Sequence, residues 1–179
     1  MNIEHVIKHL REREYMSGVE RDKSRVKFTG EVYTPTELVQ EILDKIPTEQ
    51  FTDPTKTFLD PTCGDGQFLS EVVIKKMEHG SSYEQALATT YGADLMSDNC
   101  IECIKRLHGA NGEPVIEKLE DEQIPKNYRR AGLTAIFKVN DKIATIVCAD
   151  GLKYDYSFGE TEQFEIKNAA PEAQQLFSF

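Results

Sequence analysis

The feature that most restricts the fold is a turn with two glycines between a short apolar segment and an amphipathic helix. The apolar segment covers residues 57–60 and ends on Asp60, the turn covers 61–66, and the helix pattern covers 67–78. Glycines in such a turn tolerate positive φ and let a ligand approach the backbone closely. This order is typical of an α/β fold, in which ligands bind beyond the carboxyl end of the strand.

Helix and strand patterns alternate through the rest of the chain. Further helices are expected over residues 3–10, 36–46, 81–88 and 97–107. Further strands are expected over 89–94, 133–139 and 143–148, with a weaker pattern over 164–166. Residues 140–142 join two of these strands as a hairpin. The alternation predicts an α/β fold with a Rossmann-like, mainly parallel sheet and helices on both faces.

Three of the expected strands end on an acid: Asp60, Asp94 and Asp150. Because the carboxyl ends of parallel strands meet at one edge of a sheet, these side chains are expected to converge on one crevice. Asp94 follows Gly66 by 28 residues, a spacing that suits a carboxylate binding ribose hydroxyls. Asp150 would accept a hydrogen bond from an exocyclic amine. The alternative is that each acid caps the helix that follows it.

The turn does not match the phosphate-binding motifs of nucleotide sites. It lacks the lysine of GxxxxGK[ST], and it lacks the complete GxGxxG pattern. An aspartate at the entrance to the turn repels a pyrophosphate group and attracts an ammonium group. This chemistry favours S-adenosylmethionine, which carries an α-amino group and a sulfonium, over NAD or ATP.

Four segments carry a resemblance to one protein family. They are residues 27–35 (KFTGEVYTP), 58–69 (FLDPTCGDGQFL), 91–95 (YGADL) and 148–152 (CADGL). In this order they are similar to the FxGxx[YF]TP, DPxCGxGxFL, YGxD and GDxL motifs of S-adenosylmethionine-dependent N6-adenine DNA methyltransferases. That family includes the modification subunits of type I restriction systems and related phage proteins. The resemblance implies a methyltransferase fold, S-adenosylmethionine as the cofactor and adenine in DNA as the substrate.

The resemblance also assigns roles to the matched positions around the methionine end of the cofactor. Asp60 and the backbone of Gly64 and Gly66 would hold that end. Phe28 and Thr34 would close over the cofactor from the other side.

Roles at the adenosine end follow from the later motifs. Asp94 would accept both ribose hydroxyls, Leu95 would pack on the adenine ring, and Asp150 would accept from the adenine amine. For Phe28 and Tyr33, ordinary core packing is the alternative. The full implied cofactor-binding set is Phe28, Tyr33, Thr34, Asp60, Pro61, Cys63, Gly64, Gly66, Phe68, Asp94, Leu95, Asp150, Gly151 and Leu152.

The family's catalytic tetrapeptide, [DN]PP[YFW], does not occur in this sequence. The nearest segment is 168–171 (NAAP), with Glu172 in place of the aromatic residue. Asn168 and Pro171 are therefore the candidates for catalytic residues, in what we interpret as a coincidental or decayed remnant. Few residues follow them, so we expect a truncated sheet. The isolated chain is expected to bind cofactor but to methylate DNA poorly, unless a protein partner completes the site.

Charge divides the chain unevenly. Residues 1–30 hold seven lysines and arginines and five acids, which gives them a net charge of +2. The other residues carry a net charge of −12, and the whole chain therefore carries −10. We expect a helical, net-basic arm over 1–30 and a methyltransferase-like domain over 31–179. The arm is either a solvated helical face or a segment that touches a phosphate backbone or a partner. A pI near 4.9 argues against DNA binding by bulk charge alone.

Composition excludes several other classes. No apolar run approaches the length of a membrane span, and no signal-peptide pattern occurs at the start. Four cysteines without a scaffold pattern favour a reduced cytoplasmic protein, and Cys100 and Cys103 are interpreted as core residues, because no second pair follows for a metal site. Two classes of function remain: a DNA adenine methyltransferase, or an inactive cofactor-binding subunit, regulator or competitor of restriction–modification enzymes.

Overall fold

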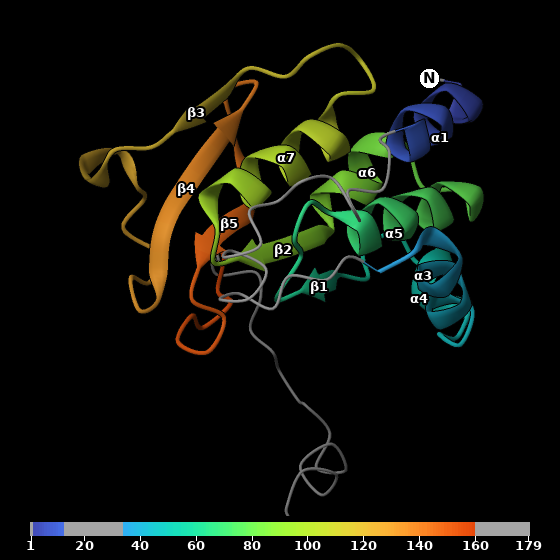
Figure 1. The fold of residues 1–179 in the computed structure, drawn as a ribbon, viewed down its shortest axis with the longest axis horizontal. Helices are drawn as coiled ribbons and strands as arrows, with labels where there is room; N and C mark the ends of the chain where they lie inside the picture. Colours follow the sequence, from blue (N-terminus) through green and yellow to red (C-terminus); the bar gives the residue numbers. More distant parts are fainter. Residues whose placement is uncertain (1, 13–33, 160–179) are drawn as a thin grey trace, which may run out of the picture.

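The computed structural model describes residues 2–12 and 34–159 (Figure 1). Phe28, Tyr33, Asn168 and Pro171 lie outside these ranges, as do most of the expected arm and the strand pattern at 164–166. The helices are α1 (Ile3–Glu12), α3 (Thr36–Leu43), α4 (Glu49–Thr52), α5 (Gln67–Glu78), α6 (Tyr83–Ala88), α7 (Ser97–His108) and the 3-10 helix η1 (Asp121–Gln123). The strands are β1 (Phe58–Asp60), β2 (Thr90–Asp94), β3 (Ile116–Lys118), β4 (Leu133–Val139) and β5 (Lys142–Ala149).

The strands form one mixed sheet in the order β1-β2-β5-β4-β3. β1, β2 and β5 are parallel, with Asp60 beside Gly92 and Asp94 beside Cys148. β4 and β3 continue the sheet in antiparallel pairing. The predicted α/β class is confirmed. In the parallel part, β1 ends at Asp60, β2 ends at Asp94, and Asp150 follows the last residue of β5.

The predicted hairpin is confirmed between β4 and β5. Asn140 and Asp141, in the turn, have φ values of 47° and 66°. Both values lie in the left-handed region, as a two-residue turn that matches the twist of the strands requires. Asn140 also accepts from the backbone N–H of Val115 through its side chain, at 3.1 Å. The turn thereby anchors the segment that leads into β3.

The two faces of the sheet are covered differently. Residues of α1, α5, α6 and α7 pack with β4 and β5 in the larger core, so these helices lie on one face (Figure 1). The core on the other face holds no α-helical residue. Side chains of the loops around η1 and after β5, including Tyr128 and Tyr154, pack there on residues of β2, β4 and β5. Within the described residues, the expectation of helices on both faces is therefore not met, because aromatic side chains from loops cover the second face.

α1 is packed on the body of the protein. Val6 and Leu10 are buried in the larger core. Arg11 donates to both carboxylate oxygens of the buried Glu71 in α5, at 3.0 and 2.8 Å. His9 contacts the backbone oxygen of Arg106, near the end of α7, at 3.1 Å. The described start of the expected arm is thus joined to α5 and α7 by apolar and polar contacts.

Several boundaries differ from the sequence-based expectation. α3 ends at Leu43 rather than near Ile46, and α4 is not among the expected helices. Phe51 of α4 is buried and stacks on Phe58 of β1, with ring centroids 5.0 Å apart. β3 was not expected either. No helix in residues 2–12 and 34–159 is long and apolar enough to cross a membrane.

Candidate functional site

The glycine turn lies between β1 and α5 and is fixed by its backbone. Gly64 and Gly66 have φ values of 53° and 86°, both in the left-handed region that favours glycine. The N–H of Cys63 donates to Ala93 in β2 at 2.9 Å, and the N–H of Gly66 donates to Cys63 at 2.8 Å. A Cβ atom at Gly66 would lie 2.7 Å from the sulfur of Cys103. The turn therefore packs so closely on α7 that only glycine fits there.

Asp94 brings the ends of β1 and β2 together, as the sequence predicts. Its Oδ2 accepts from the N–H of Gly64 at 3.1 Å. Its Oδ1 accepts from the N–H of Met96 at 2.8 Å and from the side chain of Asn99 at 3.1 Å. A carboxylate has about four acceptor positions, so about one stays available to a ligand. Binding of both ribose hydroxyls by Asp94 would require one of these internal bonds to be exchanged.

Asp60 lies at the carboxyl end of β1, where it accepts from the N–H of Thr62 at 3.0 Å. Burial raises the pKa of Asp60, and the negative charge of Asp94 raises the same pKa further. Neither acid forms an ion pair with a lysine or arginine in the described part of the chain. The two carboxylates therefore make a negative region beside the turn, which a bound cation would stabilise.

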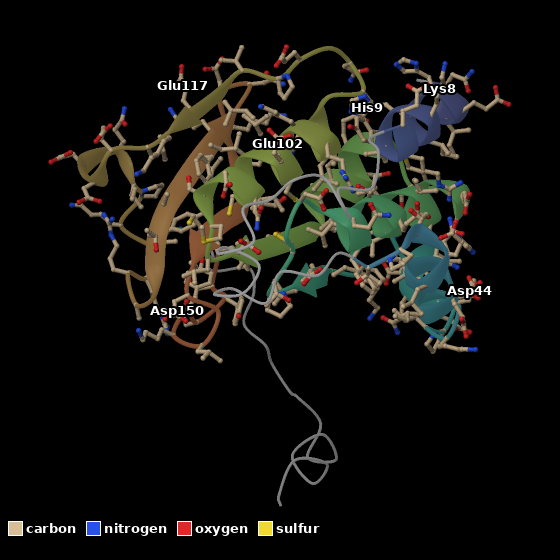
Figure 2. All side chains as sticks on the ribbon, viewed as in Figure 1. Lys8, His9, Asp44, Glu102, Glu117 and Asp150 are labelled. Atoms are coloured by element: carbon tan, nitrogen blue, oxygen red, sulfur yellow. The ribbon has the colours of Figure 1, made fainter. Side chains whose placement is uncertain are left out.

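The loop after β5 reaches the same edge of the sheet. A Cβ atom at Gly151 would lie 3.1 Å from the backbone oxygen of Pro61, so this loop meets the glycine turn. Asp150 itself follows β5 directly (Figure 2), and its side chain is 31% exposed. It pairs with Lys153 at 3.0 Å, and this contact lowers the pKa of Asp150. Its Oδ1 accepts from the N–H of Leu152 at 3.0 Å. With two acceptor positions in use, Asp150 retains positions that could accept from an adenine amine.

The remaining described site candidates occupy different surroundings. Cys63 is buried under the turn, and Thr34 is half-buried just before α3. Phe68 packs against the apolar cluster between α3 and α5. Leu95 and Leu152 are 61% and 98% exposed.

Sequence reasoning missed two buried polar residues next to the turn. Asp65 lies between the two glycines and pairs with Arg106 of α7 at 2.7 Å, with both side chains almost fully buried. An aspartate between two glycines of a buried turn was a signal that it needs a partner. Nothing in the sequence identified Arg106, because it follows Asp65 by 41 residues on a helix with other basic residues.

The four cysteines are buried and free, as expected for core residues. Cys63 and Cys103 contact each other under the turn, and this contact, with burial, raises the pKa of the Cys63 thiol. Thiols in this state are poor nucleophiles. Within residues 2–12 and 34–159, no group of three or more histidine, cysteine or acidic side chains is arranged to hold a metal ion.

Comparisons with known proteins return no match. No protein-family model matches the sequence, and neither the curated proteins nor the solved structures include a significant match.

Proposed function

We propose that this protein binds S-adenosylmethionine at the carboxyl ends of β1, β2 and β5 and belongs to the class of DNA adenine N6-methyltransferases. The observation that carries the proposal is the pair of carboxylates, Asp60 and Asp94, beside a glycine turn and without a described cationic partner. A cationic α-amino group placed there would relieve their mutual repulsion. The four ordered sequence motifs supply the chemical identity of the ligand.

The described residues fit such a ligand in three respects. Gly64 and Gly66 hold positive-φ conformations that glycine adopts without strain, so the turn keeps its shape between β1 and α5. Asp94 retains an acceptor position for a ribose hydroxyl. Leu95 is an exposed apolar side chain next to Asp94, available to an adenine ring. When bound, the cofactor supplies an activated methyl group. The protein's part is to hold and orient the two ends of the ligand.

A second candidate function is favoured by one observation on the sequence. The tetrapeptide that orients the target amine in the resembled family does not occur, and NAAP at 168–171 lacks the aromatic ring. A base taken out of the helix is normally stacked on such a ring. The alternative is therefore a cofactor-binding subunit, regulator or competitor of restriction–modification enzymes that does not transfer the methyl group by itself.

Transfer of a tritiated methyl group to adenine-containing DNA separates the two candidates. The loss of a stacking platform and of an oriented acceptor corresponds to a slowing of roughly 10³–10⁵-fold. We expect the isolated chain to show transfer near background on both duplex and single-stranded DNA. Fast turnover that collapses in Asn168→Ala would instead make NAAP a working catalytic loop. Fast turnover that survives this substitution would require another acceptor site. Transfer to no substrate, together with absence of cofactor binding, would contradict both candidates.

A further inference from the structure

A buried ion pair lies directly behind the glycine turn. Nη2 of Arg106 donates to Oδ2 of Asp65 at 2.7 Å, and the two side chains are 2% and 5% exposed. Arg106 follows Cys103 by one helical turn, and the sulfur of Cys103 already fills the space next to Gly66. Residues three apart lie on the same face of a helix. α7 therefore supports the turn with two neighbouring side chains of one face.

The same guanidinium also connects the turn to α5 and α3. Nη1 of Arg106 donates to Oε1 of Gln67 at 2.5 Å. Nε2 of Gln67 donates to the hydroxyl of Thr36 at 2.7 Å. We call these four side chains, Asp65, Arg106, Gln67 and Thr36, the turn network. It runs from the middle of the glycine turn to the first residue of α3, two positions after Thr34.

The other end of α7 holds the opposite side of the turn. Asp94 accepts from the N–H of Gly64 and from the side chain of Asn99, in the first turn of α7. The turn is thus fixed at Gly64 from the start of α7 and at Asp65 from its last turn. A shift of α7 would move both attachments together.

Stability alone does not account for such an ion pair. The desolvation of two buried charges is costly, and apolar residues of similar volume often replace a buried pair without loss of stability. Arginine fixes the relative position of two acceptors, because its planar guanidinium presents donors to both of them at fixed angles. Here the acceptors belong to the glycine turn and to the first residue of α5.

We infer that Arg106 is a positioning residue. It holds the glycine turn and the start of α3 in the relative geometry that receives the methionine end of the cofactor. This inference rests on the proposed function and extends it to a residue outside the four motifs. Arg106 acts through Asp65 and Gln67, so it is not a residue that touches the ligand.

The test uses the full chain and two variants. The double variant Asp65→Leu with Arg106→Met removes both charges and fills the space with apolar side chains of similar volume. Arg106→Lys keeps the positive charge but loses the planar guanidinium that donates to two acceptors. For each protein we would measure urea unfolding, hydrogen exchange of the amides in residues 63–67, and calorimetric affinity for S-adenosylhomocysteine. Amides of β2 and β5 serve as internal references. We expect the turn amides to exchange at least 10-fold faster in both variants, while the reference amides are unchanged. We expect the dissociation constant to rise at least 10-fold.

A folded double variant with unchanged amide exchange in the glycine turn and unchanged affinity would overturn the inference. It would show that apolar residues can replace the Asp65–Arg106 ion pair. If the double variant does not fold, the same two measurements on Arg106→Lys decide, and wild-type values there would overturn the inference. Faster turn exchange in a protein whose wild type does not bind the ligand would support the positioning of the turn and contradict the proposed cofactor.

Discussion

Asp60, at the candidate site, is expected to lower the stability of the fold and to favour the binding of a cation. Its pKa is raised by burial and by the charge of Asp94. A carboxyl group whose folded pKa is above its unfolded pKa contributes stability below the unfolded pKa, and that contribution is lost as the pH rises through the folded pKa. Above its folded pKa the ionised Asp60 therefore opposes folding, and a bound cation would offset this cost.

Substitution of Asp60 should consequently have opposite effects on stability and on binding. Asp60→Asn keeps an oxygen that can accept from the N–H of Thr62 and removes the charge of a half-buried side chain. At pH 7 we expect the free energy of unfolding to rise by about 0.5–2 kcal/mol, the range common for single stabilising substitutions. The affinity for S-adenosylmethionine should fall. At acid pH the stabilities of variant and wild type should converge, because protonation of wild-type Asp60 removes its charge.

Urea unfolding at the two pH values, with titration calorimetry at pH 7, checks this prediction. Asp121→Asn is the matched control, because the Asp121 side chain is 89% exposed. An Asp60→Asn protein that is less stable at pH 7 would show that the carboxylate is a structural requirement rather than a site for a cation.

At the scale of the elements, backbone conformation and close packing together restrict which residues the glycine turn can hold. Gly66 and Gly80 both have φ in the left-handed region, at 86° and 101°. They differ in space: a Cβ at Gly66 meets Cys103, whereas a Cβ at Gly80 has no atom within 4 Å. Gly80→Ala should therefore cost about 1 kcal/mol for the backbone conformation alone. Gly66→Ala should cost about 1–3 kcal/mol more, because the new methyl group overpacks against α7.

Chemical denaturation of the two alanine variants measures the difference directly. Equal losses in the two proteins would mean that α7 can move away from the turn at no cost. That result would also remove the basis for describing α7 as its rigid support.

Elements with strong local patterns were predictable from the sequence. The helices at α5 and α7 carry apolar stripes at helical spacing, and the β4–β5 hairpin is marked by Asn140 and Asp141 between β-rich runs. The convergence of Asp60, Asp94 and the glycine turn also followed from the sequence, since parallel strands place their carboxyl ends at one edge.

Elements that depend on distant partners were not predictable. β3 has a single apolar residue, Ile116, and exists because it pairs with β4. α4 is one turn long, and its buried Phe51 is held by the ring of Phe58. The pairing of Asp65 with Arg106 joins residues 41 positions apart, and no local pattern encodes such a contact.

At the scale of the whole molecule, α1 belongs to the packed body through a polar tie as well as apolar contacts. Glu71 is buried and accepts two bonds from Arg11 and one from Gln40, so it joins α1, α3 and α5. Arg11→Met would leave the Glu71 carboxylate without its cation. We expect a loss of about 2 kcal/mol, below the range for fully buried pairs, because the Arg11 side chain is 41% exposed.

Lys8→Met provides the control on the same helix. Lys8 pairs with Glu12 in solvent, with side chains 70% and 62% exposed. Such a pair contributes less than about 0.5 kcal/mol, so urea unfolding should barely change. A similar loss in the two variants would mean that the Glu71 contact does not hold α1.

The central claim is that the edge of the sheet at Asp60 and Asp94 binds S-adenosylmethionine, and calorimetric titration with S-adenosylmethionine or S-adenosylhomocysteine tests it most directly. We predict saturable binding by the wild-type chain, and a loss of about 1–3 kcal/mol in Asp94→Ala, the range for leaving polar partners unpaired. Asp121→Ala, at an exposed position, should bind like the wild type. A wild-type protein that binds neither ligand at millimolar concentration would contradict the account.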